Sequence, residues 1–416
     1  MTRILVTGAD GVLGRAVVRA ALQKGVTVRA WTHRPAVSKT SEIQYIDGDI
    51  QDVVLADTAT KNVEIVLHLA ARKRDEPDSH DVNVDGSRIL AEAARRNGVS
   101  SFIYVSTQSA KLKEQGVYAK TKREGEDAVR SVFPNVTVIR PSLLIGDTID
   151  GLIGTLMSAV ALLFTPVFGS GQAIFRPMHI DDLSVALITL ALKDESKGKV
   201  MDAGGSEEYT FIELLHLLRG VRGSRGKTVK LPVWMGLIIA KVLSHLPHPP
   251  ITRSNVIGGN EVVPMDVGEF RRLGEVQSRP LAEALRSAWQ KTKIGKEPAL
   301  LLGYIGAKPM PSLVERYSQA CRLHNREQAI DTSRFLLPLQ DAWTKLYEKN
   351  GVLQDKLLIA AAIYEADIHS ANALLPRERS LAIVILQSIL YGLYGAVMII
   401  ACHILFLFPA RTRHGV

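Results

Sequence analysis

The sequence predicts an α/β fold: a doubly wound parallel sheet with a smaller second lobe, then an all-helical region and one C-terminal transmembrane helix. Through the first 150 residues, short continuous apolar runs such as RILVT and SFIYV alternate with helical patterns. Such runs are typical of parallel strands covered by helices on both faces. From Pro298 onward strand patterns disappear, and residues 381–408 form a long uncharged apolar run.

Six strands and three helices are expected in the first part of the chain. The strands are predicted at 3–8, 26–31, 43–49, 63–71, 101–107 and 135–141, and the helices at 11–25, 82–97 and 118–131. In the second lobe, apolar stretches at 155–169, 180–193, 210–218 and 231–243 are expected to be helices. His179 is interpreted as a packing residue, with Asp181 and Asp182 capping a helix that begins at Leu183.

The expected domains are a nucleotide-binding core at 1–150, a smaller substrate lobe at 151–297 with some return to the core, a helical region at 298–380 and the membrane helix at 381–408. With 46% hydrophobic and 22% charged residues, the chain is globular rather than disordered. Since MTRILVTGADG enters a strand at once, no signal or transit peptide is expected.

Net charge and cysteine content narrow the classes of partner. A net charge of +9 and a pI of about 9.4 favour anionic partners such as phosphates and lipid headgroups. No nucleic-acid motif accompanies the basic residues, so nucleic acid is not expected as a partner. Cys321 and Cys402 build neither a disulfide framework nor a zinc site. Glu365 and His369 have helical spacing but no second such pair, so no metal site is expected.

The stretch TGADGVLG carries the strongest functional signal. Gly8 permits a tight turn after the first strand, Gly11 lets backbone approach a pyrophosphate, and Gly14 lets the helix pack closely on the strand. The phosphates then lie at the positive end of the helix. This pattern predicts a Rossmann-type dinucleotide site. The residues expected at the nucleotide from this turn are Gly8, Asp10, Gly11, Val12, Leu13 and Gly14.

The end of the second strand suggests which dinucleotide binds. It offers no acidic residue for the ribose hydroxyls; His33 and Arg34 follow instead. A guanidinium there suits the 2′-phosphate of NADP. NADP(H) is therefore preferred, NAD(H) stays possible, and the alternative is a solvated basic loop. Asp49, followed by Ile50, is placed to accept a hydrogen bond from the adenine amino group.

These motifs, with HLAA, NVDGSRILAEAA, YVST, YAKTK and IRPSLLIG, resemble the short-chain dehydrogenase/reductase superfamily over residues 1–290. The nearest likeness is to an atypical extended branch that includes the dinucleotide-binding accessory subunit of respiratory complex I and proteins linked to ubiquinone synthesis. The resemblance implies catalytic roles for Tyr118, Lys122 and Thr107, with Ser106 as the neighbouring candidate. It also implies that Asn83 lies near the end of the proton relay. The remaining cofactor-binding residues expected are Leu69, Ala70, Ala71, Lys122 and Pro141.

The physical chemistry of the Tyr118–Lys122 pair fits that implication. Spaced i, i+4, the two side chains share one helix face. A close ammonium is expected to lower the pKa of the phenol and to hold the nicotinamide ribose, while Thr107 stabilises charge on the substrate oxygen. The loop from Thr107 to Tyr118 spans only 118 − 107 = 11 positions. Sugar-modifying members usually have a longer loop, and several short-loop members bind nucleotide without known turnover.

The C-terminal run at 381–408 contains no Asp, Glu, Lys or Arg over 28 residues. At about 1.5 Å per residue it is long enough for a hydrocarbon layer of about 30 Å. We therefore expect a single-pass protein of the inner or cell membrane, with its nucleotide domain facing the cytoplasm. Ser388, Gly392 and Ala396 form a small-residue stripe that suits a homodimer or a membrane protein complex.

Three functions remain open from the sequence. The first is an oxidoreductase of a lipophilic carbonyl or quinone-type substrate. The second is a non-catalytic nucleotide-binding subunit or assembly factor of a membrane complex. A nucleotide-sugar epimerase or dehydratase is disfavoured by the short loop.

Overall fold

The computed structural model describes residues 2–33, 43–72, 79–149, 151–245, 251–304 and 310–324, with residues 356, 359–360 and 362–363. The chain divides into two compact units, residues 1–288 and 289–416. In the described part, no helix is both long and apolar enough to cross a bilayer. The predictions made at Arg34, Glu365, His369, Ser388, Gly392, Ala396 and the 381–408 run lie outside the described residues.

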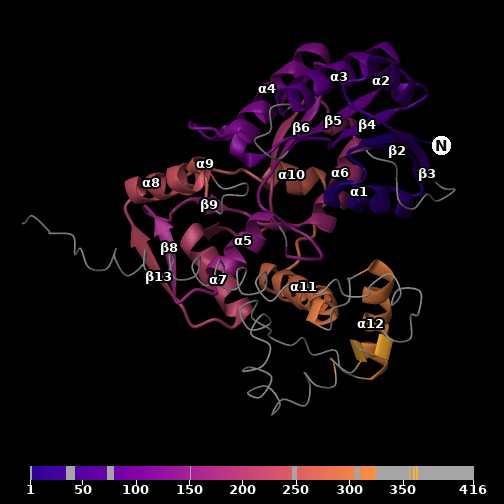
Figure 1. Cartoon of the computed structure of the whole chain (residues 1–416). Coiled ribbons are helices and arrows are strands. Elements are labelled where there is room, and N and C mark those ends of the chain that lie inside the picture. The colour runs from indigo at the N-terminus through magenta and orange to yellow at the C-terminus, as the bar shows by residue number, and fades with distance from the viewer. Residues whose placement is uncertain are drawn as a thin grey trace, which may run out of the picture. The chain divides into compact units, whose positions relative to one another are not determined.

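A parallel sheet forms the centre of the first unit (Figure 1). Within the described residues it has seven strands in the order β11-β6-β5-β4-β1-β2-β3. They are β1 (Arg3–Thr7), β2 (Thr27–Thr32), β3 (Ile43–Asp47), β4 (Ile65–His68), β5 (Ser101–Val105), β6 (Thr137–Pro141) and β11 (Val200–Ala203). Every neighbouring pair is parallel. The six predicted strands are thereby confirmed. Strands are added on one side of β1 up to β3 and on its other side from β4 onward. In sheets of this kind, ligands bind at the carboxyl ends of the strands where this switch occurs.

Helices cover both faces of this sheet. They include α1 (Val12–Gln23), α2 (Val53–Thr60), α3 (Gly86–Arg96), α4 (Val117–Val132) and α6 (Ile180–Ala191). Ile4 and Val6 belong to one buried cluster with residues of α1 and α6, whereas Leu5 belongs to another with residues of α3 and α4. Alternate side chains of β1 thus enter two cores, which explains why its sequence is apolar throughout.

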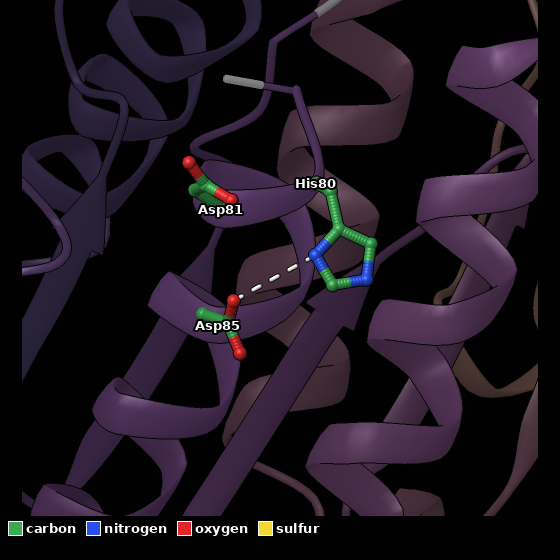
Figure 2. Close-up of side chains that lie close together, drawn as sticks. All are labelled: His80, Asp81 and Asp85. Atoms are coloured by element: carbon green, nitrogen blue, oxygen red, sulfur yellow. Dashed lines mark ion pairs between the residues drawn. The ribbon is translucent and has the colours of Figure 1, made fainter. Parts of the chain in front are cut away.

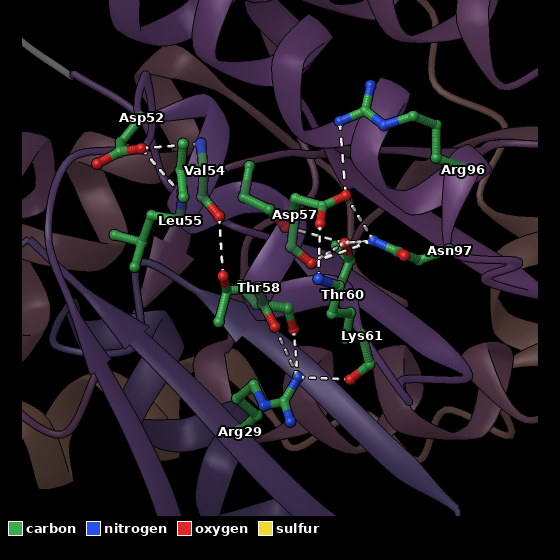
Figure 3. Close-up of polar contacts among 12 residues, drawn as sticks. Arg29, Asp52, Val54, Leu55, Asp57, Thr58, Thr60, Lys61, Arg96 and Asn97 are labelled. Atoms are coloured by element: carbon green, nitrogen blue, oxygen red, sulfur yellow. Dashed lines mark hydrogen bonds and ion pairs between the residues drawn. The ribbon is translucent and has the colours of Figure 1, made fainter.

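A buried arginine holds the end of α2. Arg29 on β2 donates from Nη1 to the carbonyl oxygens of Ala59 at 2.6 Å and Lys61 at 2.8 Å (Figure 3). Carbonyls at the end of a helix lack partners within that helix, and a cation there also suits the negative end of the helix. Burial lowers the pKa of Arg29 from its usual value. Its position shows that this basic residue has a structural role.

The second lobe contains short strand pairs as well as helices. The pairs are β7 (Leu144–Ile145) with β10 (Met178–His179), β9 (Ile174–Phe175) with β12 (Tyr209–Thr210), and β8 (Phe164–Phe168) with β13 (Lys227–Leu231). The helices are α5 (Gly151–Ala159), α7 (Phe211–Arg222), α8 (Val233–Leu243), α9 (Arg253–Gly258) and α10 (Gly268–Leu273). The helix expected over 155–169 is wrong beyond Ala159. Pairing with β13 holds residues 164–168 extended, and Pro166 could not continue a helix.

The described residues of the second unit are helical. The helix α11 (Leu281–Tyr304) continues into it, and α12 (Pro311–Leu323) follows. Its core contains Leu301, Leu313 and Tyr317. An ion pair is buried there, with Lys356 Nζ 2.5 Å from Glu297 Oε1, which also accepts from the Tyr317 hydroxyl at 3.1 Å.

Candidate dinucleotide and catalytic site

The glycine turn at the end of β1 has no room for larger residues. Gly8 has a φ of +65°, and a Cβ there would lie 2.9 Å from the Ala70 backbone. A Cβ on Gly14 would lie 2.1 Å from the carbonyl oxygen of Gly8. Gly11 begins α1 without a side-chain cap, so that helix start can offer N–H groups to an anion. Asp10 and Val12 are exposed beside this turn, and Leu13 is partly exposed.

A buried histidine, His68, directly precedes the loop that faces this turn and forms hydrogen bonds through both ring nitrogens. His68 Nδ1 lies 2.7 Å from Thr7 Oγ1, and its Nε2 lies 2.8 Å from Ser87 Oγ. The Ser87 hydroxyl donates to the Asn83 carbonyl, so Nε2 of His68 is the donor to Ser87 and Nδ1 accepts from Thr7. This network needs a neutral ring. Burial, with a smaller effect of the Lys122 charge, lowers the pKa of His68 to about 3.

The same threonine anchors the start of the HLAA loop. Thr7 Oγ1 accepts from the backbone N–H groups of Leu69 and Ala70, both at 3.2 Å. Leu69, Ala70 and Ala71 are partly exposed. The loop therefore lies against the glycine turn, as the close approach of Ala70 to Gly8 requires.

Asn83 joins this loop to the helix of the Tyr–Lys pair. It lies in the π-helical turn η1 (Asp81–Asp85) and is 1% exposed. Its Oδ1 accepts from Arg72 N at 2.7 Å, and its Nδ2 donates to Thr121 Oγ1 at 2.9 Å. These contacts account for an asparagine at this position. The relay role implied by the resemblance stays a prediction.

Tyr118 and Lys122 lie on α4 close to β5. Lys122 is 1% exposed, and its Nζ lies 4.1 Å from the centre of the Tyr104 ring, a cation–π contact. Gly125 lets the helix come this close, because a Cβ there would lie 2.4 Å from both the Tyr104 hydroxyl and the Asn83 carbonyl oxygen. The sheet, α4 and η1 thus enclose the ammonium.

The pKa of Tyr118 moves opposite to our expectation. We expected the Lys122 ammonium to lower it, but burial of the phenol raises the pKa of Tyr118 to about 12. Loss of water around the phenol disfavours its charged form, and the described contact of the Lys122 ammonium is with the Tyr104 ring instead. A raised pKa makes the phenol a weaker acid, so the lowered pKa expected of the Tyr–Lys pair is not found in the free protein.

Two hydroxyls follow β5. Thr107 caps the short 3₁₀ helix η2 (Gln108–Lys111), where its Oγ1 accepts from Ser109 N at 3.3 Å. A hydroxyl that accepts one bond can still donate another. Ser106 is 5% exposed, and its Oγ has no hydrogen-bond partner in the part of the chain that the structure describes. A buried unpaired hydroxyl costs free energy, so it fits a site that a ligand completes.

The adenosine side contains a carboxylate that the sequence motifs do not single out. Asp47, at the end of β3, accepts from Thr32 Oγ1 at 2.6 Å and so lies beside the end of β2. His33 is exposed there. Asp49 is exposed, its Oδ1 accepts from Gln51 N, and the buried Ile50 packs where α3 begins at Gly86. Asp47 stands in the stretch IQYIDGD, but only the pairing of β2 with β3 brings it to Thr32.

Pro141 lies buried at the end of β6, where it pairs with Ala203 of β11. It therefore stands at the carboxyl edge of the sheet, the edge at which β1 ends in the glycine turn.

Two side-chain groups in the described residues have the spacing of metal ligands. In the first, the exposed His80 lies 3.6 Å from Asp85, with Asp81 nearby (Figure 2). His80 also lies 3.8 Å from Glu124. These side chains are exposed or partly exposed, and their spacing is also that of ordinary surface pairs.

The second group contains Asp147, His179 and Asp181. His179 is buried and is itself the N-cap of α6, since its Nδ1 accepts from Asp181 N at 3.2 Å. The expectation that the aspartates cap a helix beginning at Leu183 is therefore wrong. The helix begins three residues earlier, and Asp181 instead lies 3.3 Å from Arg19 of α1.

Comparison with known proteins identifies the family. Residues 4–204 match the NAD dependent epimerase/dehydratase family. This part of the chain belongs to that family. An NAD(P) dinucleotide is the cofactor typical of its members, and the predicted resemblance to extended short-chain dehydrogenases is confirmed.

Two curated relatives show the range of the family. A ceramide reductase of Caulobacter vibrioides is 29% identical over 234 residues, which are 55% of this chain and 73% of the relative. The mitochondrial NADH-ubiquinone oxidoreductase 40 kDa subunit of Neurospora crassa is 26% identical over 283 residues, 65% of this chain and 74% of the relative.

Among solved structures, an Agrobacterium tumefaciens short-chain dehydrogenase/reductase superfamily protein with bound NAD superposes with a TM-score of 0.56. It is 21% identical, and the match covers 71% of this chain and 99% of that protein. At this identity the likeness supports the fold alone.

Proposed function

We propose that the protein is a membrane-anchored, NADP(H)-dependent reductase of a lipophilic carbonyl or quinone-type substrate. The observation that carries this proposal is the Tyr118–Lys122 pair, one helical turn apart on α4, with the Lys122 ammonium enclosed against the Tyr104 ring. Similarity to a ceramide reductase supports a lipid substrate. The apolar run at 381–408 supports a single-pass anchor, with the nucleotide domain on the cytoplasmic side.

The residues would divide the work of reducing a carbonyl as follows. A bound nicotinamide would supply the hydride that the carbonyl carbon accepts. Tyr118 donates its proton to the carbonyl oxygen, so that hydride and proton together convert C=O to an alcohol. Thr107 donates a hydrogen bond to the same oxygen and stabilises its developing charge. Lys122 keeps a positive charge beside the phenolate that remains.

The glycine turn would hold the pyrophosphate, and His33 with Arg34 would favour the 2′-phosphate of NADP. Asp47 works against that preference, because a carboxylate beside Thr32 could accept from ribose hydroxyls as in an NAD site. Comparing NADPH with NADH binding in wild type and Arg34→Ala tests the preference. The variant should lose affinity for NADPH and keep that for NADH.

A second candidate function is a nucleotide-binding structural subunit of a membrane complex. It is favoured by the structural contacts of the Asn83 side chain and by similarity to mitochondrial NADH-ubiquinone oxidoreductase subunits. The stripe Ser388, Gly392 and Ala396 would then pack against a neighbouring membrane helix.

The deciding experiment measures NADPH oxidation by detergent-purified full-length protein against long-chain ketones, oxidised ceramides and quinones. Wild type should oxidise NADPH with at least one substrate, and Tyr118→Phe should lose about 10²-fold or more with NADPH binding intact. Tyr209→Phe, on β12 of the second lobe, is the matched control and should keep wild-type turnover. Equal turnover in Tyr118→Phe would contradict the proposal, and tight NADPH binding without turnover of any substrate would favour the structural subunit.

A further inference from the structure

The helix α8 has an apolar outer face. Trp234, Ile238 and Val242 are 61%, 55% and 65% exposed. Their i, i+4, i+8 spacing places them along one side of the helix. Single exposed apolar residues are common, but a stripe containing a tryptophan is a feature of interaction surfaces.

The opposite face of α8 already holds the helix in the fold. Gly236 lies against the Phe168 ring of β8, since a Cβ there would come within 2.6 Å of it. Ala240, one turn later, is 3% exposed. The outer stripe is therefore not needed to pack α8 on its own lobe.

In the sequence around this helix the charged residues are of one sign, although Arg253 pairs with Glu114 from another part of the fold at 3.2 Å. From Leu214 to Asn260 the chain has no Asp or Glu and seven cations: Arg219, Arg222, Arg225, Lys227, Lys230, Lys241 and Arg253. Lys241 is exposed and follows Ile238 by three positions, so it projects from the same side as the stripe. A lysine within an apolar face can bury its stem while its ammonium reaches a phosphate.

We propose that the outer face of α8 docks on the surface of an anionic lipid bilayer. Trp234, Ile238 and Val242 enter the boundary between headgroups and acyl chains, where tryptophan is favoured. Lys241, exposed beside the stripe, contacts lipid phosphates. A bilayer is favoured over a protein partner because the same chain carries the uncharged run at 381–408, which would keep lipid at high local concentration.

This docking goes beyond the proposed reductase and does not require turnover. It would bring the second lobe to the membrane, where a lipophilic substrate is dissolved. A structural subunit could use the same face, so failure of the activity assay leaves the docking proposal standing.

The test uses the full chain in vesicles, with Cys321 and Cys402 replaced and an environment-sensitive fluorophore on Ile238→Cys. The control label is on Val54→Cys, which is 76% exposed on α2. In vesicles of phosphatidylcholine with phosphatidylglycerol, the label at 238 should shift to shorter wavelength and be quenched by nitroxides on lipid acyl chains. The label at 54 should show neither effect.

The charge contribution is tested by Lys241→Glu, which should reduce acyl-chain quenching of the label at 238 several-fold. Lys61→Glu, at the end of α2, is the control and should leave that quenching unchanged.

Equal access of aqueous iodide to labels 238 and 54 would overturn the proposal. Protection of label 238 from iodide in vesicles, without quenching by acyl-chain nitroxides, would also overturn it, because protein rather than lipid would then cover the face. Protection that rises with protein concentration would indicate a second copy, and concentration-independent protection would indicate another segment of this chain.

Discussion

At Gly14 the backbone leaves no space for one extra carbon. A Cβ would overlap the carbonyl oxygen of Gly8 and the backbone of Ala9, which directly follow β1. Side-chain rotation cannot relieve that overlap, so the turn itself would have to open. The glycine pattern therefore reflects steric necessity at the site where a pyrophosphate would bind.

We predict that Gly14→Ala lowers stability and abolishes dinucleotide binding. The matched control is Gly220→Ala in α7, where a Cβ meets no atom within 4 Å. There the change should raise the free energy of unfolding by up to about 1 kcal/mol, because alanine favours helix. Urea unfolding and NADPH titration of both variants check the prediction. Wild-type NADPH affinity in Gly14→Ala would contradict it.

At the scale of elements, the position of α4 determines where Tyr118 and Lys122 lie. Two features hold α4 against the sheet. The first is the absence of a side chain at Gly125, and the second is the buried pair formed by Glu126 with Arg140 of β6. Arg140 Nε and Nη2 lie 3.0 and 2.5 Å from the two carboxylate oxygens of Glu126. Hydrogen bonding to that carboxylate raises the pKa of Arg140, so its charge is retained. Breaking such a pair leaves a cation enclosed without its partner.

We predict that Glu126→Ala destabilises the protein by about 3 kcal/mol or more, since Arg140 would keep an uncompensated charge. Glu124→Ala on the same helix is the control. Glu124 lies 3.9 Å from Lys120 in a surface pair, so its loss should change stability by about 0.5 kcal/mol or less. Chemical denaturation compares the two variants. Equal effects would mean that the Glu126–Arg140 pair does not anchor α4.

For the whole molecule, stability depends on pH through groups that the sheet encloses. His68 has a folded-state pKa of about 3, whereas an unfolded histidine titrates near its ordinary pKa of 6.5. As the pH falls below 6.5, the unfolded chain takes up a proton that the folded protein does not. The stabilising contribution is therefore present above pH 6.5 and is progressively lost toward pH 3.

We predict that this histidine makes the free energy of unfolding fall by about 1.4 kcal/mol per pH unit between pH 6 and 4. His68→Asn should lower stability at pH 7, because it disturbs the bonds to Thr7 and Ser87, yet show a shallower slope. Urea unfolding at pH 7, 6, 5 and 4 gives both slopes. Parallel curves for wild type and variant would show that another group causes the acid sensitivity.

Local patterns in the sequence determined much of the nucleotide domain. The six strands, the glycine turn and the spacing of Tyr118 and Lys122 were predictable, because apolar periodicity, backbone sterics and helical geometry act over a few neighbouring residues. The same reasoning failed at 155–169, where apolar residues suited both helix and strand. Only pairing with β13, some 60 residues later in the chain, selected the strand at 164–168.

Tertiary structure alone decided the electrostatics of the site. Spacing predicted an ammonium near Tyr118, but burial of the phenol set the direction of its pKa shift, and the ammonium lies over the Tyr104 ring. Likewise Asp47 reaches Thr32 only through the pairing of β2 with β3, and β11 joins the sheet only at the edge of β6. Burial and strand pairing depend on residues far apart in the chain, whereas the sequence patterns report neighbours. The sequence by itself therefore determined the local elements and the glycine turn, whereas the tertiary structure decided burial, strand pairing and the pKa shifts that follow from them.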